Sequence, residues 1–116
     1  MGRSKRLICD SAILQEGGKG VRFIVERQGE SQPAFAIRHQ GAVYAYLNRC
    51  AHIATELDWA EGEFFDLTGL YLMCSTHGAT YLPNTGRCLR GPCSGRGLAR
   101  LPVEESGGKV YLLSEQ

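Results

Sequence analysis

The sequence predicts an all-β protein, an antiparallel β-sandwich made of short strands. Runs of alternating β-forming residues dominate the chain, and helical periodicity is poor outside one turn within Ala54–Ala60. The 15 glycines among 116 residues fit a fold with many tight turns. A chain of this length is large enough to bury one core, so we expect residues 1–116 to form a single domain.

Strands are expected at short intervals along the chain. After an N-terminal strand that carries Cys9 into the core, the predicted strands are Val21–Arg27, Ala34–Arg38, Ala42–Asn48, Leu70–Met73, Leu98–Glu104 and Lys109–Leu113. A turn at His39-Gln40-Gly41 precedes Ala42–Asn48, and we expect His39 to be exposed there. The last two strands form a closing hairpin around Ser106-Gly107-Gly108.

Composition and charge argue against several functional classes. The net charge is +1, so nothing favours nucleic acid or an anionic membrane as a partner. No apolar run approaches the roughly 18–20 residues of a membrane span, and the first residues lack the apolar core of a secretory signal. We therefore expect a cytoplasmic protein, where cysteines more often bind metals than form disulfides.

Two short pairs of cysteine and histidine are the most informative feature of the chain. They are Cys50-Ala51-His52 and Cys74-Ser75-Thr76-His77, each just past a predicted strand, with 21 residues between His52 and Cys74. Two thiolates and two imidazoles suit a Rieske [2Fe–2S] cluster, in which two cysteines hold one iron and two histidines hold the other. An ordinary ferredoxin site has four cysteine ligands and no mixed pairs of this kind.

The mixed ligand set has a redox consequence. With two cysteinates and two neutral histidines the oxidised cluster carries no net charge, whereas four cysteinates would leave it dianionic before any electron arrives. Adding an electron is therefore easier, and Rieske potentials lie at roughly −150 to +300 mV against about −400 mV for plant-type ferredoxins. Reduction also raises the pKa of a ligand histidine, so electron and proton uptake can be coupled.

A structural zinc site is the competing interpretation, because zinc also accepts two cysteines and two histidines. Zinc fingers usually pair like with like, two cysteines in one half and two histidines in the other. Here each pair is mixed, which favours the iron–sulfur cluster.

The segment from Asn48 to Ser94 differs from its flanks. It carries both ligand pairs, many loop residues and two loop prolines, Pro83 and Pro92. We predict that residues 48–94 form a cluster-binding subdomain inserted between strands of a base domain.

The residues around the second pair resemble the Rieske protein family. The shared features are the two ligand pairs, the step His77-Gly78, the aromatic Tyr81, the turn Thr85-Gly86 and the dipeptide Gly91-Pro92. The resemblance covers about residues 44–101 and implies a Rieske-type antiparallel β-sandwich with an inserted cluster-binding subdomain. It further implies that Cys50 and Cys74 bind the buried iron, that His52 and His77 bind the outer iron, and that the loop with Pro92 covers the cluster. By the same resemblance Tyr81 donates a hydrogen bond to a cysteine sulfur.

Departures from one branch of the family narrow the prediction. Rieske subunits of cytochrome bc complexes carry a disulfide at positions that correspond to Thr55 and Thr76, so that bridge cannot form here. Those subunits also place a serine where this chain has Ala79. The hydroxyl of that serine donates a hydrogen bond to a sulfide of the cluster. Fewer hydrogen bonds to sulfur stabilise the reduced cluster less. We expect a potential at the low end of the Rieske range, as in soluble Rieske ferredoxins.

Several other residues were weighed for function. Cys88 and Cys93 have the spacing of a redox-active pair, but we expect small buried or loop thiols. Trp59, Phe64 and Phe65 form either a docking patch or, as we expect, packing beneath a ligand loop. Acidic residues dominate Glu56–Asp66 and arginines dominate Arg87–Arg100, and this segregation suits either the steering of a redox partner or a merely solvated surface.

The sequence thus predicts a soluble one-electron carrier, a non-enzymatic component that passes electrons from a reductase to an oxygenase. A complete Rieske oxygenase also needs a mononuclear iron site of two histidines and a carboxylate. The chain has three histidines, and the cluster uses two of them. The alternatives are a small non-catalytic Rieske subunit of a larger oxidoreductase, like that of nitrite reductase, and a zinc-stabilised interaction module.

Overall fold

A computed structural model describes residues 5–27, 29–50, 55–58, 60–74, 78–91 and 96–113. Within these ranges the chain forms strands and one short 3₁₀ helix, η1 (Ser11–Ile13). The strands are β1 (Lys5–Asp10), β2 (Val21–Arg27), β3 (Glu30–His39), β4 (Ala42–Leu47), β5 (Leu72–Met73), β6 (Thr80–Tyr81), β7 (Cys88–Arg90), β8 (Arg100–Leu101), β9 (Val103–Ser106) and β10 (Lys109–Leu113). No helix in this part of the chain has the length and apolar character to cross a membrane.

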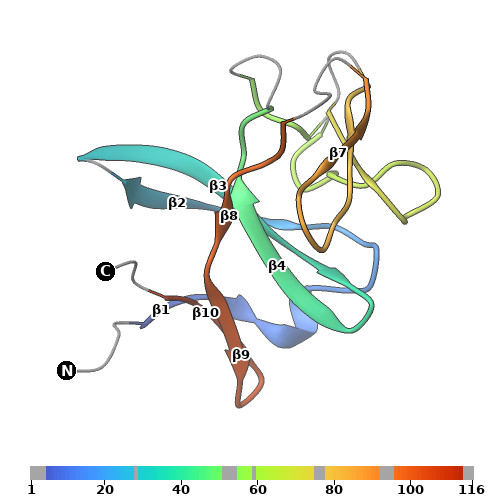
Figure 1. The fold of residues 1–116 in the computed structure, drawn as a ribbon. Coiled ribbons are helices and arrows are strands. Elements are labelled where there is room, and N and C mark those ends of the chain that lie inside the picture. The colour runs from blue at the N-terminus through green and yellow to red at the C-terminus, as the bar shows by residue number, and fades with distance from the viewer. Residues whose placement is uncertain are drawn as a thin grey trace.

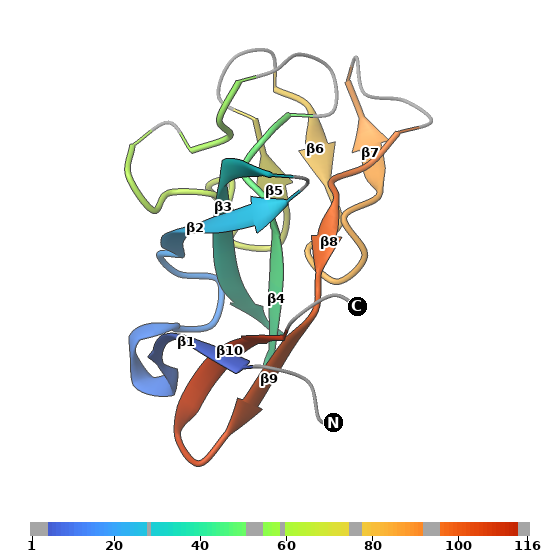
Figure 2. The same ribbon diagram turned by 90° about the vertical axis from the view of Figure 1, so that its left-hand side faces the viewer.

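The strands form three antiparallel sheets, which agrees with the predicted all-β class. Sheet A has the order β1-β10-β9, sheet B the order β2-β3-β4-β8 and sheet C the order β5-β6-β7. Sheet B lies between the other two, with sheet A at one end of the molecule and sheet C at the other (Figures 1 and 2). Sheet C is made only of residues from the segment that carries the predicted ligands.

Most of the predicted strands are present, with three differences: β3 begins four residues earlier than predicted, β6 and β7 were not predicted, and one predicted strand is divided. β2 and β10 have the predicted bounds, and the closing hairpin forms around Gly107 and Gly108. The predicted strand Leu98–Glu104 instead divides at Pro102 into β8, which pairs with β4, and β9, which pairs with β10. Proline has no N–H to donate to a ladder, and the chain changes from sheet B to sheet A at this residue.

Strand β3 is buried on both faces, and its sequence shows which face meets which sheet. Ala34 and Ala36 pack into the core between sheets A and B. Phe35 and Ile37 point the other way, into the core between sheets B and C, because side chains alternate along a strand. The Phe35 ring stacks on Phe64 with 3.9 Å between the ring centroids. Large apolar side chains therefore line the side that supports the predicted metal site.

The turn between β3 and β4 corrects the prediction for His39. The two turn residues are Gln40 and Gly41, with φ of 52° and 82°, as a tight hairpin with two positive φ angles requires. His39 pairs with Ala42 as the last residue of β3 and is only 9% exposed. It is a buried strand residue rather than an exposed turn residue, because the packing of β3 continues to its end.

Arg38 joins sheet A to sheet B. Its guanidinium forms an ion pair with Glu105 at 2.6 Å and donates to the carbonyl oxygens of Leu14 and Ser11 at 2.7 and 3.2 Å. The carboxylate of Glu16 accepts the N–H groups of Gln40 and Gly41. The hydrogen bond from Arg38 holds the pKa of Glu105 below its ordinary value. The backbone N–H groups of Gly41 and Gln40 do the same for the pKa of Glu16.

Candidate metal centre

Cys50 and Cys74 lie at equivalent places in two loops. Each follows a strand, β4 or β5, forms no disulfide and is almost fully buried, at 4% and 1% exposure. The N–H of Cys50 donates to the oxygen of Thr55 at 2.8 Å, and the N–H of Cys74 donates to the oxygen of Ala79, also at 2.8 Å. Both loops therefore close with the same bond, from the cysteine to the residue five positions later.

The two predicted histidine ligands, His52 and His77, fall inside these two closed loops in the sequence but outside the described residues. For this reason the described part of the chain contains no group of three or more ligand-type side chains. Cys50 and Cys74 nevertheless share one core, together with Ala79, Tyr81 and Cys88. The structure thus brings the two predicted thiolate ligands into one apolar environment.

The hydroxyl of Tyr81 lies 3.3 Å from the sulfur of Cys50. Tyr81 is fully buried and belongs to β6, the central strand of sheet C, where it pairs with Leu72 of β5 and Cys88 of β7. The strand pairing thus fixes the backbone from which its hydroxyl reaches the sulfur. Two buried cysteines in matching loops, one of them with the Tyr81 hydroxyl within 3.3 Å of its sulfur, fit the cysteine side of a Rieske cluster.

Asn48 and Asp58 hold the two ends of the first ligand loop together. Both side chains are buried: Asn48 is 1% exposed and the Asp58 side chain 2%. The Asn48 amide oxygen accepts the N–H of Leu57 at 2.8 Å, and its nitrogen donates to Asp58 at 3.3 Å. Asp58 also accepts the N–H of Gly62 at 3.0 Å. No local signal in the sequence connects Asn48 with a partner ten residues away. The contribution of Asn48 and Asp58 to the loop could therefore not be predicted from the sequence.

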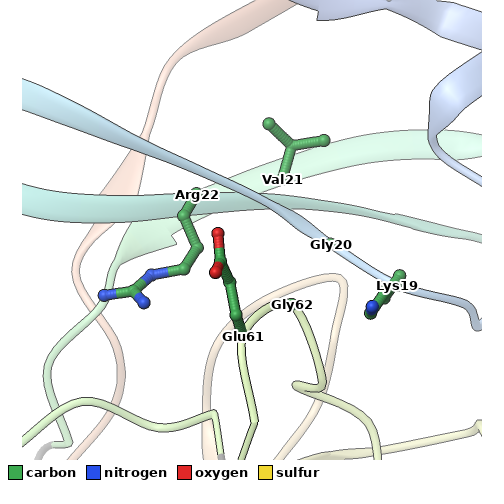
Figure 3. Close-up of a pocket in the computed structure, with 6 residues that line it drawn as sticks. All are labelled: Lys19, Gly20, Val21, Arg22, Glu61 and Gly62. Carbon is green, nitrogen blue, oxygen red and sulfur yellow. The ribbon is translucent and has the colours of Figure 1, made fainter.

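Arg22 connects the first ligand loop to sheet B. From β2 its guanidinium reaches Glu56 at 2.6 Å and Asp58 at 3.7 Å. Arg22 also borders a pocket of about 320 Å³ between β2 and the loop, and Figure 3 shows its side chain and that of Glu61 at this pocket. The lining residues are Lys19, Gly20, Val21, Arg22, Glu61 and Gly62. None of these residues is a predicted ligand. The pocket is lined by β2 and the residues just before it, together with Glu61 and Gly62, and not by the predicted ligand pairs.

Gly91 packs the end of β7 against the second ligand loop. Its φ is +98°, and a Cβ atom added there would lie 2.9 Å from the Cα atom of Ala79, which is too close for any residue but glycine. Thr80 pairs with Arg90 just before this contact. The chain that leads to the predicted proline loop thus touches the loop of Cys74, whereas Pro92 itself lies outside the described residues.

Cys88 is disulfide-bonded, which corrects the expectation of a loop thiol. Cys9, Cys50 and Cys74 form no disulfide, and Cys93, the fifth cysteine of the sequence, lies outside the described residues. Cys88 is 8% exposed and sits opposite Tyr81 in sheet C. β7 therefore carries a disulfide at its first residue, Cys88. The spacing of the cysteines in the sequence did not establish this bond.

Three other residues considered for function, Cys9, Phe64 and Phe65, are buried in the hydrophobic cores. Cys9 is buried in the core between sheets A and B, and burial raises the pKa of its thiol. Phe64 and Phe65 are 0% and 7% exposed and pack in the core beneath the ligand loops, as expected. Trp59 lies outside the described residues.

Comparisons with known proteins agree with this geometry. A family model described as Rieske [2Fe-2S] domain matches residues 5–105, and no curated protein sequence matches the chain. Among solved structures, a chain from a complex of reduced oxygenase and oxidized ferredoxin in carbazole 1,9a-dioxygenase is similar, with 26% identity, a TM-score of 0.73 and coverage of 97% of this chain and 94% of that one.

Two structures of isolated ferredoxins have the same fold over their whole lengths. The ferredoxin of carbazole 1,9a-dioxygenase from Nocardioides aromaticivorans IC177 is 20% identical, with a TM-score of 0.72 and coverage of 97% of this chain and 99% of that one. The Sphingomonas yanoikuyae B1 ferredoxin is also 20% identical, with a TM-score of 0.72 and coverage of 97% and 100%. At this identity the likeness establishes the fold.

Proposed function

Because the chain belongs to the Rieske [2Fe-2S] domain family, we propose that it is a one-electron carrier that takes electrons from a reductase and passes them to an oxygenase. The observation that carries this proposal is the pair of buried cysteines, Cys50 and Cys74, in two loops that are closed by equivalent hydrogen bonds. The match along the full length of ferredoxins, one of them from a structure of a ferredoxin–oxygenase complex, supports the direction of transfer.

The ligand set that we propose is Cys50 and Cys74 on one iron and His52 and His77 on the other. When bound, such a cluster accepts and releases a single electron at a potential that its ligands and hydrogen bonds set. The chain supplies the surroundings. The apolar core excludes water from the two sulfurs, the Tyr81 hydroxyl meets the sulfur of Cys50, and the carboxylate of Asp58 holds the first loop closed.

The chain provides no second catalytic centre in this proposal. Beyond the two proposed ligands its only other histidine is His39, which is buried at the end of β3. Its Nδ1 atom has no hydrogen-bond partner among the described residues, and His39 directly precedes the turn whose Gly41 N–H donates to Glu16. One buried histidine cannot form the two-histidine, one-carboxylate iron site of an oxygenase, so chemistry on an organic substrate belongs to a partner protein.

We further propose that residues 48–94 act as the cluster-binding subdomain of a single domain, 1–116. Sheet C lies entirely within this segment, while β4 before it and β8 after it are neighbours in sheet B, which supports an insertion. A cytoplasmic location is also proposed. Cys9, Cys50 and Cys74, which form no disulfide, support it, whereas the disulfide at Cys88 is unusual for that compartment. Fractionation of cells that express the chain would test it.

The decisive experiment is an EPR spectrum of the dithionite-reduced protein, with iron, zinc and acid-labile sulfide measured on the same sample. We expect equal iron and sulfide and a rhombic signal with the low average g value of Rieske centres. A colourless protein with one zinc per chain would instead establish a zinc-stabilised module. Co-purification with a larger oxidoreductase in constant stoichiometry would identify a fixed subunit rather than a mobile carrier.

A further inference from the structure

Strand β2 is one edge of sheet B. On one side it pairs with β3, and no strand in the described ranges pairs with its other side. The oxygen of Pro33 in β3 accepts the N–H of Asn48, just after β4, and so points to the β4 side. Ile24 stands opposite Pro33 in the ladder, and this pair therefore shares no hydrogen bond. Because such pairs alternate in an antiparallel ladder, the N–H and C=O groups of Arg22, Ile24 and Glu26 point away from β3, toward the open side.

The open side of β2 has defined ends. Just before the strand, the N–H of Gly20 points the same way and donates to the oxygen of Gly62 at 2.7 Å, which closes the edge there. At the other end β2 finishes at Arg27, where it turns into β3, and the hairpin of the two strands extends to one side of the molecule (Figure 1). The open stretch therefore runs from Val21 to Arg27 and is centred on Ile24.

β2 lacks the features that usually prevent an edge strand from pairing with another strand, such as bulges, prolines and lysines. It pairs with β3 along its whole length without a shift in register, and its sequence, VRFIVER, contains no proline, glycine or lysine. Ile24 at its centre is 48% exposed. The charged residues two positions to either side, Arg22 and Glu26, have opposite signs. The open side is therefore complementary to a second copy of itself.

We propose that β2 pairs with β2 of a second copy in antiparallel orientation, about a twofold axis at Ile24, so that the two sheets B join into one. In this register Ile24 faces Ile24 of the second copy and Arg22 faces Glu26, and both are hydrogen-bonded pairs. On the side of sheet A the half-buried Phe23 faces the buried Val25, two residues of the core between sheets A and B. The pairing goes beyond the proposed carrier function and does not depend on it.

Charge selects this register over its alternatives. A twofold axis at Arg22 or at Glu26 would place like charges directly opposite each other, which destabilises a strand pair. Glu26 forms no ion pair with another residue of the described ranges, and the axis at Ile24 brings a guanidinium to it. Arg22 also pairs with Glu56 and Asp58 of its own chain. We therefore expect this contact to fix the register, and the backbone ladder and Ile24 to supply most of the affinity.

The ends of the two strands fit the same register. With the axis at Ile24, Arg27 of one copy lies opposite Val21 of the other, so the pairing stops before the bond between Gly20 and Gly62. At this end of β2 the pocket of about 320 Å³, lined by these two glycines and Val21 among others (Figure 3), leaves room for the hairpin of the second copy. The open stretch of one copy thus has the length that the other copy requires.

Sedimentation velocity tests the association. An interface made by one strand from each copy is at the small end of the size range for protein complexes, so we expect a reversible dimer. The weight-average mass of the purified 116-residue chain should rise from that of one chain toward that of two between roughly 5 and 500 µM.

A matched pair of variants locates the interface. Ile24→Lys places two like charges against each other at the axis and should weaken the association about tenfold or more. The control is Leu7→Lys, which makes the same change at an apolar residue that is 51% exposed on β1, the edge strand of sheet A. The control should associate within about twofold of the wild type.

Cross-linking tests the register. Residues that form a hydrogen-bonded pair have Cα atoms about 5.5 Å apart, within the reach of a disulfide. Ile24→Cys should therefore give a covalent dimer when dipyridyl disulfide is added: an S–S bond forms between the copies, and both thiol hydrogens pass to the reagent, which leaves as two pyridinethiones. Glu26→Cys should give none, because the two copies of residue 26 are four positions apart, or about 13 Å.

The outcomes decide between the possible occupants of the edge. A mass that stays at one chain at every concentration would overturn the pairing with a second copy and leave the edge to a strand of another protein. Equal weakening by Ile24→Lys and Leu7→Lys would exclude β2 as the interface, and cross-linking at position 26 instead of 24 would exclude the register. The carrier function is unaffected by any of these results, since the EPR spectrum and the iron and sulfide contents test it separately.

Discussion

The sulfur of Cys50 and the hydroxyl of Tyr81 lie 3.3 Å apart, although 31 positions separate the two residues in the chain. Cys50 follows β4 of sheet B, whereas Tyr81 belongs to β6 of sheet C. The contact therefore spans the boundary between the base sheet and the cluster-binding sheet. It requires both the packing of the shared core and the pairing of β6 with its two neighbours.

Replacing Tyr81 by phenylalanine should lower the reduction potential by about 40 mV. A hydroxyl that donates to a ligand sulfur stabilises the more negative reduced cluster, and a bond of about 1 kcal/mol corresponds to that shift for one electron. Protein-film voltammetry measures it. The matched control is Tyr46→Phe, which removes another fully buried hydroxyl, bonded to the oxygen of Pro83 at 2.7 Å. The control should lose about 1 kcal/mol of stability and keep its potential; equal potential shifts in both variants would contradict the assignment.

Replacing Asp58 by alanine should loosen the first ligand loop. The change leaves the buried N–H of Gly62 without its acceptor and removes the more distant of the two carboxylates around Arg22, which keeps Glu56. We expect a loss of about 1–3 kcal/mol of stability. Release of iron to a chelator, followed by the loss of visible absorption, should be faster than in the wild type. Asp66→Asn is the control, because the Asp66 carboxylate accepts hydrogen bonds within its own turn, from the N–H and the hydroxyl of Thr68. Equal release rates in both variants would exclude the positioning role of Asp58.

The disulfide at Cys88 should stabilise the chain. We predict Cys93 as its partner, which peptide mapping without reductant will identify. The bond would then close a loop of six residues, for which the chain-entropy estimate is about 2 kcal/mol. Treatment with a dithiol should lower the unfolding midpoint of the wild type and of Cys9→Ala, which removes a free thiol, but not that of Cys88→Ser. An unchanged wild-type midpoint would show that the bond adds no stability.

Stability should fall in acid partly through Glu105. Its pKa lies below the ordinary value of 4.5 because the guanidinium of Arg38 binds its carboxylate. A lowered pKa in the folded state contributes stability above pH 4.5 that is lost as the pH falls through the folded-state pKa. Urea unfolding of the wild type and of Glu105→Gln between pH 7 and pH 3 measures this share. The variant should be less stable at pH 7, and the difference should shrink toward pH 3; a constant difference would contradict the linkage.

Local signals in the sequence were sufficient for most of the strands, but not for β6 and β7. The alternation of Val21–Arg27 and of Lys109–Leu113 gave the observed bounds of β2 and β10, because a period of two is a property of each strand by itself. Cys50 and Cys74 follow β4 and β5 as predicted. The residue types of the two pairs indicated the kind of cluster, since ligand chemistry depends on side chains and not on the fold.

Tertiary structure decided what depends on residues far apart in the chain. His39 is buried because both faces of β3 are covered, which no alternation pattern reveals. Arg22 meets Asp58 across 36 positions, and Cys88 is oxidised rather than free. Burial, ion pairing and disulfide formation are properties of neighbours in space. The sequence by itself determined the all-β class, most of the strands and the residue types of the proposed ligand pairs, and only packing decided which groups surround them.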